Sequence, residues 1–216
     1  MPAWRNAGET LRDGRPDGHM MDEQQRMIID WVQADPYRMQ ALDQAAALGL
    51  NDWCLAAGFL RNLVWDRLHD YPVPTPLNDL DLIYFDPAGD SVERDRSLER
   101  RLRARTSWPW SVKNQARMHL RNGDAAYTDT MDAMSYWPEV ETAIGVRIDP
   151  SGGLELLTPF GLEALFAMTI TMNPRRSGPE IFRKRVIGKG WLQHWPRLHV
   201  VDAAALRYPL SGQAGG

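Results

Sequence analysis

Asp79 and Asp81 stand two residues apart in an apolar stretch of the chain. Their surroundings predict a strand over residues 79–85, and side chains two positions apart in a strand point to the same face of the sheet. Two neighbouring carboxylates on a mostly buried strand repel each other and lose hydration. A divalent cation relieves both costs, and Mg²⁺ prefers one or two carboxylates together with substrate phosphates. The pair therefore predicts a site for Mg²⁺ (or Mn²⁺) that handles a nucleotide phosphate.

A glycine turn upstream of the aspartates supports this interpretation. Residues 53–57 predict a buried strand that ends at Gly58, and a helix follows over residues 59–69. A glycine at such a turn lets a phosphate approach the backbone and the N-terminus of the helix. The turn and the aspartates together would hold a triphosphate from two sides. The alternative is an edge strand whose aspartates cap neighbouring turns, because a Pro-rich connector over residues 71–76 precedes them.

Three further side chains are candidate phosphate contacts. Arg61 and Asn62 lie in the first turn after Gly58, and a guanidinium can bind a phosphate with two parallel hydrogen bonds. Arginine is unfavourable at a helix N-terminus, so a bound anion would explain Arg61; the alternative is an exposed arginine paired with a local acid. Arg147 shares a predicted strand face with small residues that leave room for a ligand. We expect it to contact the triphosphate, the alternative being an ordinary exposed arginine.

The elements that must position these residues follow from hydrophobic periodicity and from turn residues. The predicted helices span residues 22–35, 36–48, 59–69, 91–105, 128–137, 158–172 and 179–187. The predicted strands span residues 53–57, 79–85, 111–118, 142–149 and 154–157, the last two as a hairpin. This order predicts an α/β (mixed α+β) fold in which a small mixed β-sheet is flanked by helices, with N-terminal and C-terminal helices added.

The length and composition of the chain suit one domain with a sizeable core, since 44% of its 216 residues are hydrophobic and 25% are charged. We expect a flexible leader over residues 1–20, a single domain over 21–209 and a flexible tail over 210–216. Cys54 is the one cysteine, which excludes an intramolecular disulfide and a cysteine-based zinc cluster. No apolar stretch suits a signal peptide or a membrane span, which predicts a soluble, cytoplasmic protein with no membrane partner. The sequence leaves the oligomeric state open.

Nucleic acid is a possible partner that the overall charge does not favour. The net charge is -3 and the pI is about 6.0. The predicted helix over residues 91–105 is rich in arginine, but acidic residues are interleaved with the basic ones. We interpret it as a solvated helix with ion pairs, the alternative being an RNA-facing stripe. The basic cluster at residues 183–185, together with Lys189, has the same two interpretations.

Several segments resemble a known family. Ala57–Asp66, Thr75–Asp81 and Thr158–Glu163 resemble a family of bacterial nucleotidyltransferase-like proteins, which is similar to the wider polymerase-β-like nucleotidyltransferase superfamily. Trp110–Arg117 and Ala143–Arg147 also follow the family's pattern. The resemblance extends from about residue 21 to residue 200.

The resemblance implies a reaction and roles for three residues. In the superfamily, an acceptor hydroxyl attacks the α-phosphate of an NTP and pyrophosphate leaves, in a reaction that resembles two-metal phosphoryl transfer. Asp79 and Asp81 match the paired carboxylates that hold the metals. Gly58 matches the glycine of the phosphate-contacting turn.

The sequence departs from the superfamily at three points. Phe59 follows the glycine where a glycine or serine usually contacts phosphate, and the linker from Gly58 to Asp79 is longer than usual. Asn114 takes the place of a third carboxylate, with Lys113 on the opposite strand face. An amide can ligate a metal but can neither neutralise charge nor act as a general base. Three other acids are candidates to complete the site: Asp86, Glu139 and Glu141.

These observations support three functions. The first is a Mg²⁺-dependent nucleotidyltransferase that moves a nucleoside monophosphate from an NTP to an acceptor hydroxyl, with Asp79, Asp81 and Asn114 as its catalytic residues. The second is a nucleotide-binding or regulatory module without transfer chemistry, which Phe59 and Asn114 motivate. The third is an RNA-binding protein that uses the arginine-rich helix. The sequence does not fix the base of the NTP or the identity of the acceptor.

Overall fold

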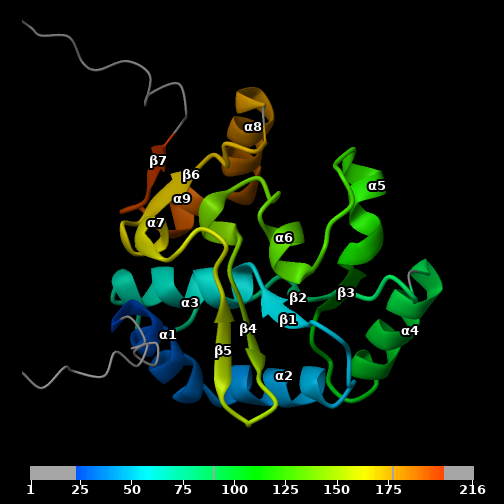
Figure 1. Cartoon of the computed structure of the whole chain (residues 1–216). Helices are drawn as coiled ribbons and strands as arrows, with labels where there is room; N and C mark the ends of the chain where they lie inside the picture. The colour runs from blue at the N-terminus through cyan, green and yellow to red at the C-terminus, as the bar shows by residue number, and fades with distance from the viewer. Residues whose placement is uncertain (1–22, 90, 177, 202–216) are drawn as a thin grey trace, which may run out of the picture.

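The computed structural model describes residues 23–89, 91–176 and 178–201, and a five-stranded mixed sheet lies at its centre (Figure 1). The strand order is β3-β2-β1-β4-β5. The strands are β1 (Cys54–Ala56), β2 (Leu80–Tyr84), β3 (Trp110–Asn114), β4 (Gly145–Ile148) and β5 (Leu154–Leu157). Strands β2 and β3 run parallel, and the other neighbouring pairs of this sheet run antiparallel. The prediction of a small mixed sheet flanked by helices is confirmed.

The helices and the remaining strands are arranged around this sheet. The helices are α1 (Glu23–Gln33), α2 (Pro36–Ala46), α3 (Gly58–Leu68), α4 (Val92–Arg103), α5 (Met118–Asn122), α6 (Thr130–Met134), α7 (Glu163–Phe166), α8 (Pro179–Lys189) and α9 (Trp191–His194). Two 3₁₀ turns are η1 (Gln115–Arg117) and η2 (Val140–Thr142), and a second sheet pairs β6 (Thr169–Thr171) with β7 (His199–Val201) in parallel. In Figure 1, α5, α6 and α8 stand above the edge of the central sheet. The predicted leader and tail lie outside the described residues.

The two faces of the central sheet are covered unequally. Strand residues such as Leu55, Leu82 and Val112 belong to the main core, which also contains buried side chains of α1 to α4. Because side chains alternate along a strand, the next residues belong to the other face. There a much smaller cluster forms around Cys54 and Ile83. Asp81 lies on this second face, where room is left for a ligand.

Helix starts follow the local sequence. The Asp35 carboxylate accepts hydrogen bonds from the N–H groups of Tyr37 and Arg38, and Pro36 occupies the first turn of α2. The Ser91 hydroxyl accepts from the Arg94 N–H at the start of α4. Asp22, the first residue of the first predicted helix, lies outside the described residues.

Two predicted elements are wrong in part. The strand expected over residues 111–118 ends at Asn114, because the Asn114 side chain accepts from the Ala116 N–H and turns the chain into η1. The helix expected over residues 158–172 is limited to α7, and β6 follows it. Strand β6 forms because β7, far along the chain, pairs with it and because the buried Glu141 carboxylate accepts from the Thr171 N–H. Neither contact has a local sequence signal.

Among the described residues, every helix is too short or too polar to span a bilayer.

A close contact between neighbouring strands generates a test of this sheet. Gly145 of β4 pairs with Ala56, and an added Cβ would lie 2.6 Å from the Cys54 sulfur. Overpacking of this kind costs about 1–3 kcal/mol. Gly145→Ala should therefore lower the free energy of unfolding by about 2 kcal/mol in urea denaturation. In a Cys54→Ala background the same change should cost less than about 1 kcal/mol, since the sulfur is gone. An equal cost in both backgrounds would contradict this packing.

Candidate functional site

A strained turn joins β1 to α3. Ala57, between the strand and Gly58, has φ 55° and ψ −121°, a conformation that costs an L-residue about 1–3 kcal/mol. Its N–H donates to the Ile144 carbonyl, and its carbonyl accepts from the Arg61 N–H. These bonds hold the turn against its strain. The first N–H groups of α3 have no acceptor within the helix, so they are available to an anion.

The aspartate pair lies next to this turn. Asp81 on β2 pairs in register with Ala56 on β1 and with Ser111 on β3. Asp79 precedes the strand and is exposed, whereas Asp81 is half-buried. Burial, and after it the negative charge of Asp79, raise the pKa of Asp81 to about 6. A hydrogen bond with Ser111 and the charges of Lys189 and Arg61 oppose this rise in the pKa.

The aspartates have no counter-ion of their own. None of the ion pairs formed within residues 23–89, 91–176 and 178–201 includes Asp79 or Asp81. Two interacting carboxylates without an ion-pair partner, one on β2 and one just before it, fit a divalent cation such as Mg²⁺. The described residues contain no group of three or more His, Cys, Asp or Glu side chains placed to hold a metal together. A cation bound here would therefore need phosphate oxygens and water to complete its coordination.

Arg61 is a buried cation in the first turn of α3. Its side chain is 7% exposed, and it donates to the Thr142 hydroxyl at 2.8 Å and to the Asn62 side-chain oxygen at 3.0 Å. Its guanidinium carbon lies 5.1 Å from the ring centre of Trp65 and 4.6 Å from that of Trp191. The Nε atom of Arg61 has no hydrogen-bond partner in the described structure.

The environment of Arg61 favours the binding of an anion. Burial lowers the pKa of the guanidinium to about 10, while the charges of Glu139, Asp79 and Asp81 oppose this shift. No carboxylate of the described residues forms an ion pair with it. The interpretation of Arg61 as an exposed arginine paired with a local acid is therefore wrong. A buried guanidinium with an unbonded Nε atom, close to two aspartates, is suited to bind a phosphate. The same phosphate would coordinate a cation that the aspartates hold.

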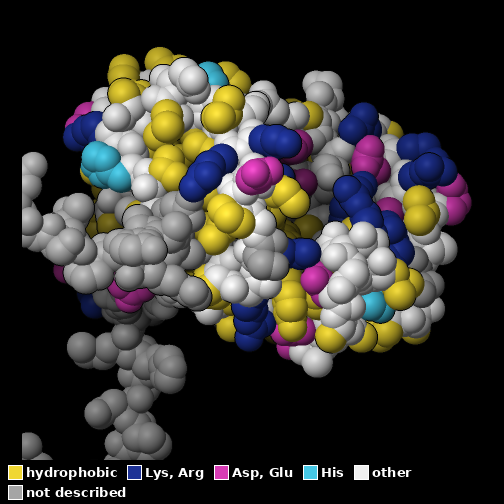
Figure 2. Space-filling model, turned by 90° about the horizontal axis from the view of Figure 1, so that it is seen from above, with side chains coloured by type: hydrophobic (Ala, Val, Ile, Leu, Met, Phe, Trp, Pro, Cys, Tyr) yellow, Lys and Arg dark blue, Asp and Glu magenta, His cyan; other side chains and the backbone are white. Residues whose placement is uncertain are grey.

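The two aspartates line different cavities. Asp79 lines a cavity of about 230 Å³ together with Gly58, Arg61 and Asn62, and Lys189 of α8 also lines it. We call it the turn cavity. Asp81 lines a cavity of about 370 Å³, the strand cavity, and its other polar lining residues include Ser111, Lys113, Arg121 and Arg185. Figure 2 shows several Lys and Arg side chains on this face of the molecule, above α4 and α5.

Phe59 does not contribute its side chain to either cavity. Its ring is 1% exposed and belongs to the main core, and its carbonyl accepts from Arg38 Nε at 2.9 Å. The prediction of Phe59 as a ligand contact is thus corrected for its side chain, because α3 turns that position toward the sheet. Gly58, Arg61 and Asn62 line the turn cavity, as the prediction of a common site requires.

Asn114 lies away from the aspartates, which corrects its assignment to the catalytic group. The register of β3 pairs it with Tyr84, three positions beyond the pairing of Ser111 with Asp81. Its amide donates to the carbonyls of Asp86 and Gly89 and accepts from two backbone N–H groups, so it is fully used within the fold. Alternation along the strand places Ser111 and Lys113 on the Asp81 face instead.

Arg147 also lies away from the site. It forms ion pairs with Asp52 at 2.8 Å and with Glu155 at 2.7 Å, and it lines neither cavity. Glu155 faces it directly across the β4–β5 hairpin. The prediction of a triphosphate contact is therefore corrected, because two carboxylates already occupy the guanidinium.

The candidates for a third carboxylate are engaged elsewhere. Asp86 pairs with Arg94, and Glu141 bonds to residues of β6. Glu139 is nearer the site, since its charge acts on Arg61, but Arg185 binds it through two hydrogen bonds of 2.6 and 3.1 Å. Glu139 thus fixes the guanidinium of Arg185 at the wall of the strand cavity.

Ser111 was not singled out by its sequence context, and Lys189 was noted only with the basic cluster at residues 183–185. Lys189 ends α8, more than a hundred positions after Asp79, and no local motif connects the two. Ser111 could have been assigned to the Asp81 face only with the pairing register of β2 and β3 in hand. Both are therefore contributions of the tertiary structure.

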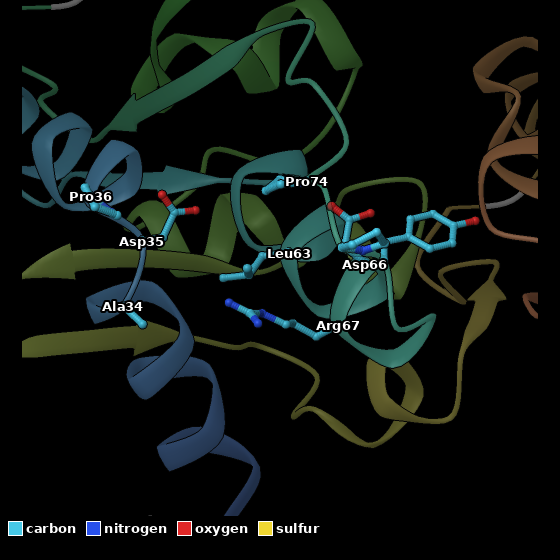
Figure 3. Close-up of a pocket in the computed structure, with 9 residues that line it drawn as sticks. Ala34, Asp35, Pro36, Leu63, Asp66, Arg67 and Pro74 are labelled. Atoms are coloured by element: carbon cyan, nitrogen blue, oxygen red, sulfur yellow. The ribbon is translucent and has the colours of Figure 1, made fainter.

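A separate cavity of about 250 Å³ lies between the α1–α2 corner and the second half of α3. Figure 3 shows Arg67 reaching from α3 toward this corner. The cavity contains none of the predicted phosphate or metal residues. Its residue Asp66 matters indirectly, because it accepts hydrogen bonds from Thr75 and from the Trp195 indole. Asp66 thereby anchors the Pro-rich connector that leads to Asp79.

The fold and the site define a protein of the nucleotidyltransferase class. Residues 43–200 match the family described as Nucleotidyltransferase, and the chain belongs to this family. A solution structure described as revealing a CCA-adding enzyme head domain is 32% identical, with a TM-score of 0.74 over 86% of this chain and 98% of that chain.

More distant likenesses concern longer chains. One is a tRNA nucleotidyltransferase complexed with a primer tRNA and an incoming ATP analogue, at 15% identity and a TM-score of 0.45 over 73% of this chain and 45% of that chain. Another is a CCA-adding enzyme with CTP, at 12% identity and a TM-score of 0.45 over 78% and 47%. This chain matches less than half of each of these two. The curated proteins contain no match to it.

The raised pKa of Asp81 predicts a stability cost at the site. The pKa of about 6 in the folded chain exceeds the ordinary 3.8, so folding disfavours the ionised carboxylate. In metal-free buffer at about pH 7.5, Asp81→Asn should raise the free energy of unfolding by about 1–2 kcal/mol at this half-buried position. The gain should shrink as the pH falls below 6 and vanish at about pH 3, below the unfolded pKa of 3.8, where Asp81 is protonated in both states.

Urea denaturation at a series of pH values measures this effect. Asp43→Asn, at an exposed position on α2, is the matched control and should change stability little at any pH. A gain for Asp81→Asn that persists in full at about pH 3 would show that the ionised carboxylate is not its cause.

Proposed function

We propose that the protein transfers a nucleoside monophosphate from an NTP to an acceptor hydroxyl, with Mg²⁺ held by Asp79 and Asp81. The observation that carries the proposal is the meeting of two uncompensated aspartates with Arg61, a buried guanidinium that lacks a carboxylate partner. The buried charges of Asp81 and Arg61 are each unfavourable alone, and Asp79 adds a second negative charge beside Asp81. A metal-bound polyphosphate would satisfy all three.

The turn cavity is suited to bind the β- and γ-phosphates of the NTP, which leave as pyrophosphate. The unpaired N–H groups at the start of α3 would bind phosphate oxygens beside Gly58. Arg61 and Asn62 line the same cavity, and Lys189 adds a second cation across from them. In this arrangement the β- and γ-phosphates lie at the turn, and negative charge that develops on the departing pyrophosphate meets these groups.

Asp79 and Asp81 would hold the metal at the junction of the two cavities. When bound, the metal neutralises charge on the reacting phosphoryl group and on the attacking and leaving oxygens. Through that metal the aspartates would place the α-phosphate, and Ser111 orients Asp81 through their hydrogen bond. The fixed strands β1 and β3 on either side of β2 limit the movement of Asp81.

A nucleotide-binding module without transfer chemistry is the second candidate. Its supporting observation is that Glu139, the nearest further carboxylate, is engaged by Arg185. The RNA-binding candidate has less support, because Arg94, Arg100 and Arg103 of α4 pair with carboxylates. These pairs favour the interpretation of α4 as a solvated helix.

Calorimetry with non-hydrolysable analogues of the four NTPs tests the proposed donor site. We expect Mg²⁺-dependent binding of at least one analogue, which Asp79→Asn and Asp81→Asn should each weaken by about tenfold or more, since each change removes a metal carboxylate. Asp43→Asn should bind as the wild type does. Binding that needs no divalent cation, or that survives both changes, would refute the metal site.

Pyrophosphate release separates the first two candidates. With α-labelled NTP, Mg²⁺ and cell extract as the source of acceptors, the wild type should release pyrophosphate and label a product. Asp81→Asn should abolish both signals. Normal analogue binding without any release would favour the binding module.

A further inference from the structure

We propose that the strand cavity is the acceptor site, and that it takes a small hydroxyl compound carrying an anionic group, which Lys113 and Arg121 bind. This rests on the proposed function and deepens it by naming the class of acceptor. The chemistry of the cavity lining and the geometry of phosphoryl transfer lead to it independently.

The geometry of transfer separates the two cavities by role. The attacking and leaving oxygens lie in line on opposite sides of the phosphorus. If pyrophosphate leaves into the turn cavity, the attacking hydroxyl must approach from the other side of the aspartate pair. The other cavity next to the pair is the one that Asp81 lines. The acceptor oxygen forms a bond to the α-phosphorus, the bond to pyrophosphate breaks, and the hydroxyl proton passes to solvent.

The charge of the strand cavity favours an anion. Its described lining contains three cations, Lys113, Arg121 and Arg185, and one carboxylate, Asp81. Arg185 is neutralised by Glu139. The Lys113 ammonium donates to the Val112 carbonyl at 3.1 Å, which leaves its charge uncompensated. Arg121 is exposed, and neither it nor Lys113 takes part in an ion pair with a described carboxylate.

The position of these two cations fits an anion on the acceptor itself. Lys113 lies two residues beyond Ser111 on the Asp81 face of β3, and Arg121 comes from α5 on the same cavity wall. Both are absent from the lining of the turn cavity, where Arg61 and Lys189 are the cations. The donor phosphates and the acceptor anion thus have separate sets of partners. A phosphate or carboxylate group would meet Lys113 and Arg121 with charge-assisted hydrogen bonds.

The cavity also has room for the body of a small acceptor. An adjoining cavity of about 340 Å³ shares Asn122, Trp137, Pro138 and Arg185 with it and continues to α8. The half-buried Trp137 indole offers a flat apolar surface between them. A nucleic acid would need a longer row of cations without carboxylate partners. Three arginines of α4 are instead paired with carboxylates. The lining therefore favours a small acceptor over a nucleic acid.

Label transfer to fractionated cell extract tests the acceptor class. Wild-type protein, Mg²⁺ and α-labelled NTP are incubated with the small-molecule fraction and, separately, with the RNA fraction. We expect the label in a small product. This product should bind an anion exchanger more tightly than the transferred nucleotide alone would, because the acceptor carries its own negative charge. Arg121→Gln and Lys113→Gln should each lower the rate at limiting acceptor by about tenfold. Affinity for the NTP analogue should stay within about twofold of the wild type.

Arg96→Gln, an exposed change on α4 outside both cavities, is the matched control and should leave every signal unchanged. Label that goes only to RNA would overturn the proposal, as would an equal loss of donor affinity in the Arg121 and Lys113 variants.

A binding measurement keeps the proposal testable if no transfer occurs. Ribose 5-phosphate, a hydroxyl compound with one phosphate, is titrated into the full chain by calorimetry. Arg121→Gln with Lys113→Gln should weaken its binding by about tenfold or more, whereas the control Arg96→Gln should not. If the wild type binds no NTP analogue but still binds ribose 5-phosphate more tightly than the double variant does, the proposed function is refuted and the anion site is not. Equal binding by the wild type and the double variant, or no binding at all, would refute the acceptor site.

Discussion

The repulsion between Asp79 and Asp81 is the interaction on which the rest of the site depends. Strand β2 is held between β1 and β3, so Asp81 cannot move away from its neighbour without breaking the sheet. Burial and the nearby charge raise the pKa of Asp81 to about 6. The ionised form of Asp81 is thus unfavourable, and no described cation forms an ion pair with it, which is the basis of the proposed binding of a divalent ion.

Two other unfavourable features lie at the same place. Ala57 holds a positive φ at the turn before α3, and Arg61 is buried without a carboxylate partner. Strain and uncompensated charge cluster at functional sites because a ligand offsets them there. The main core beneath α1 to α4 supplies the stability that allows the turn, the guanidinium and the aspartates to persist together.

The C-terminal elements complete the site. Helix α8 brings Lys189 to the turn cavity and Arg185 to the strand cavity, and α9 places Trp191 against the Arg61 guanidinium. Asp66 joins these elements to the Pro-rich connector through Trp195 and Thr75. One helix therefore contacts both sides of the aspartate pair, which suits a reaction in which donor and acceptor meet at a single phosphorus.

The sequence by itself determined the features that depend on neighbouring residues. The alternation around Asp79 and Asp81, the Gly58 turn and the cap at Asp35 are all local, since strand parity, turn conformation and helix capping are decided within a few positions. Tertiary structure decided the rest. The register of β2 against β3 placed Ser111 rather than Asn114 beside Asp81. Arg147 formed ion pairs with Asp52 and Glu155 and is not available to a ligand. Lys189 reached the site, and β6 became a strand, only through contacts between residues far apart in the chain, whose geometry no local pattern encodes.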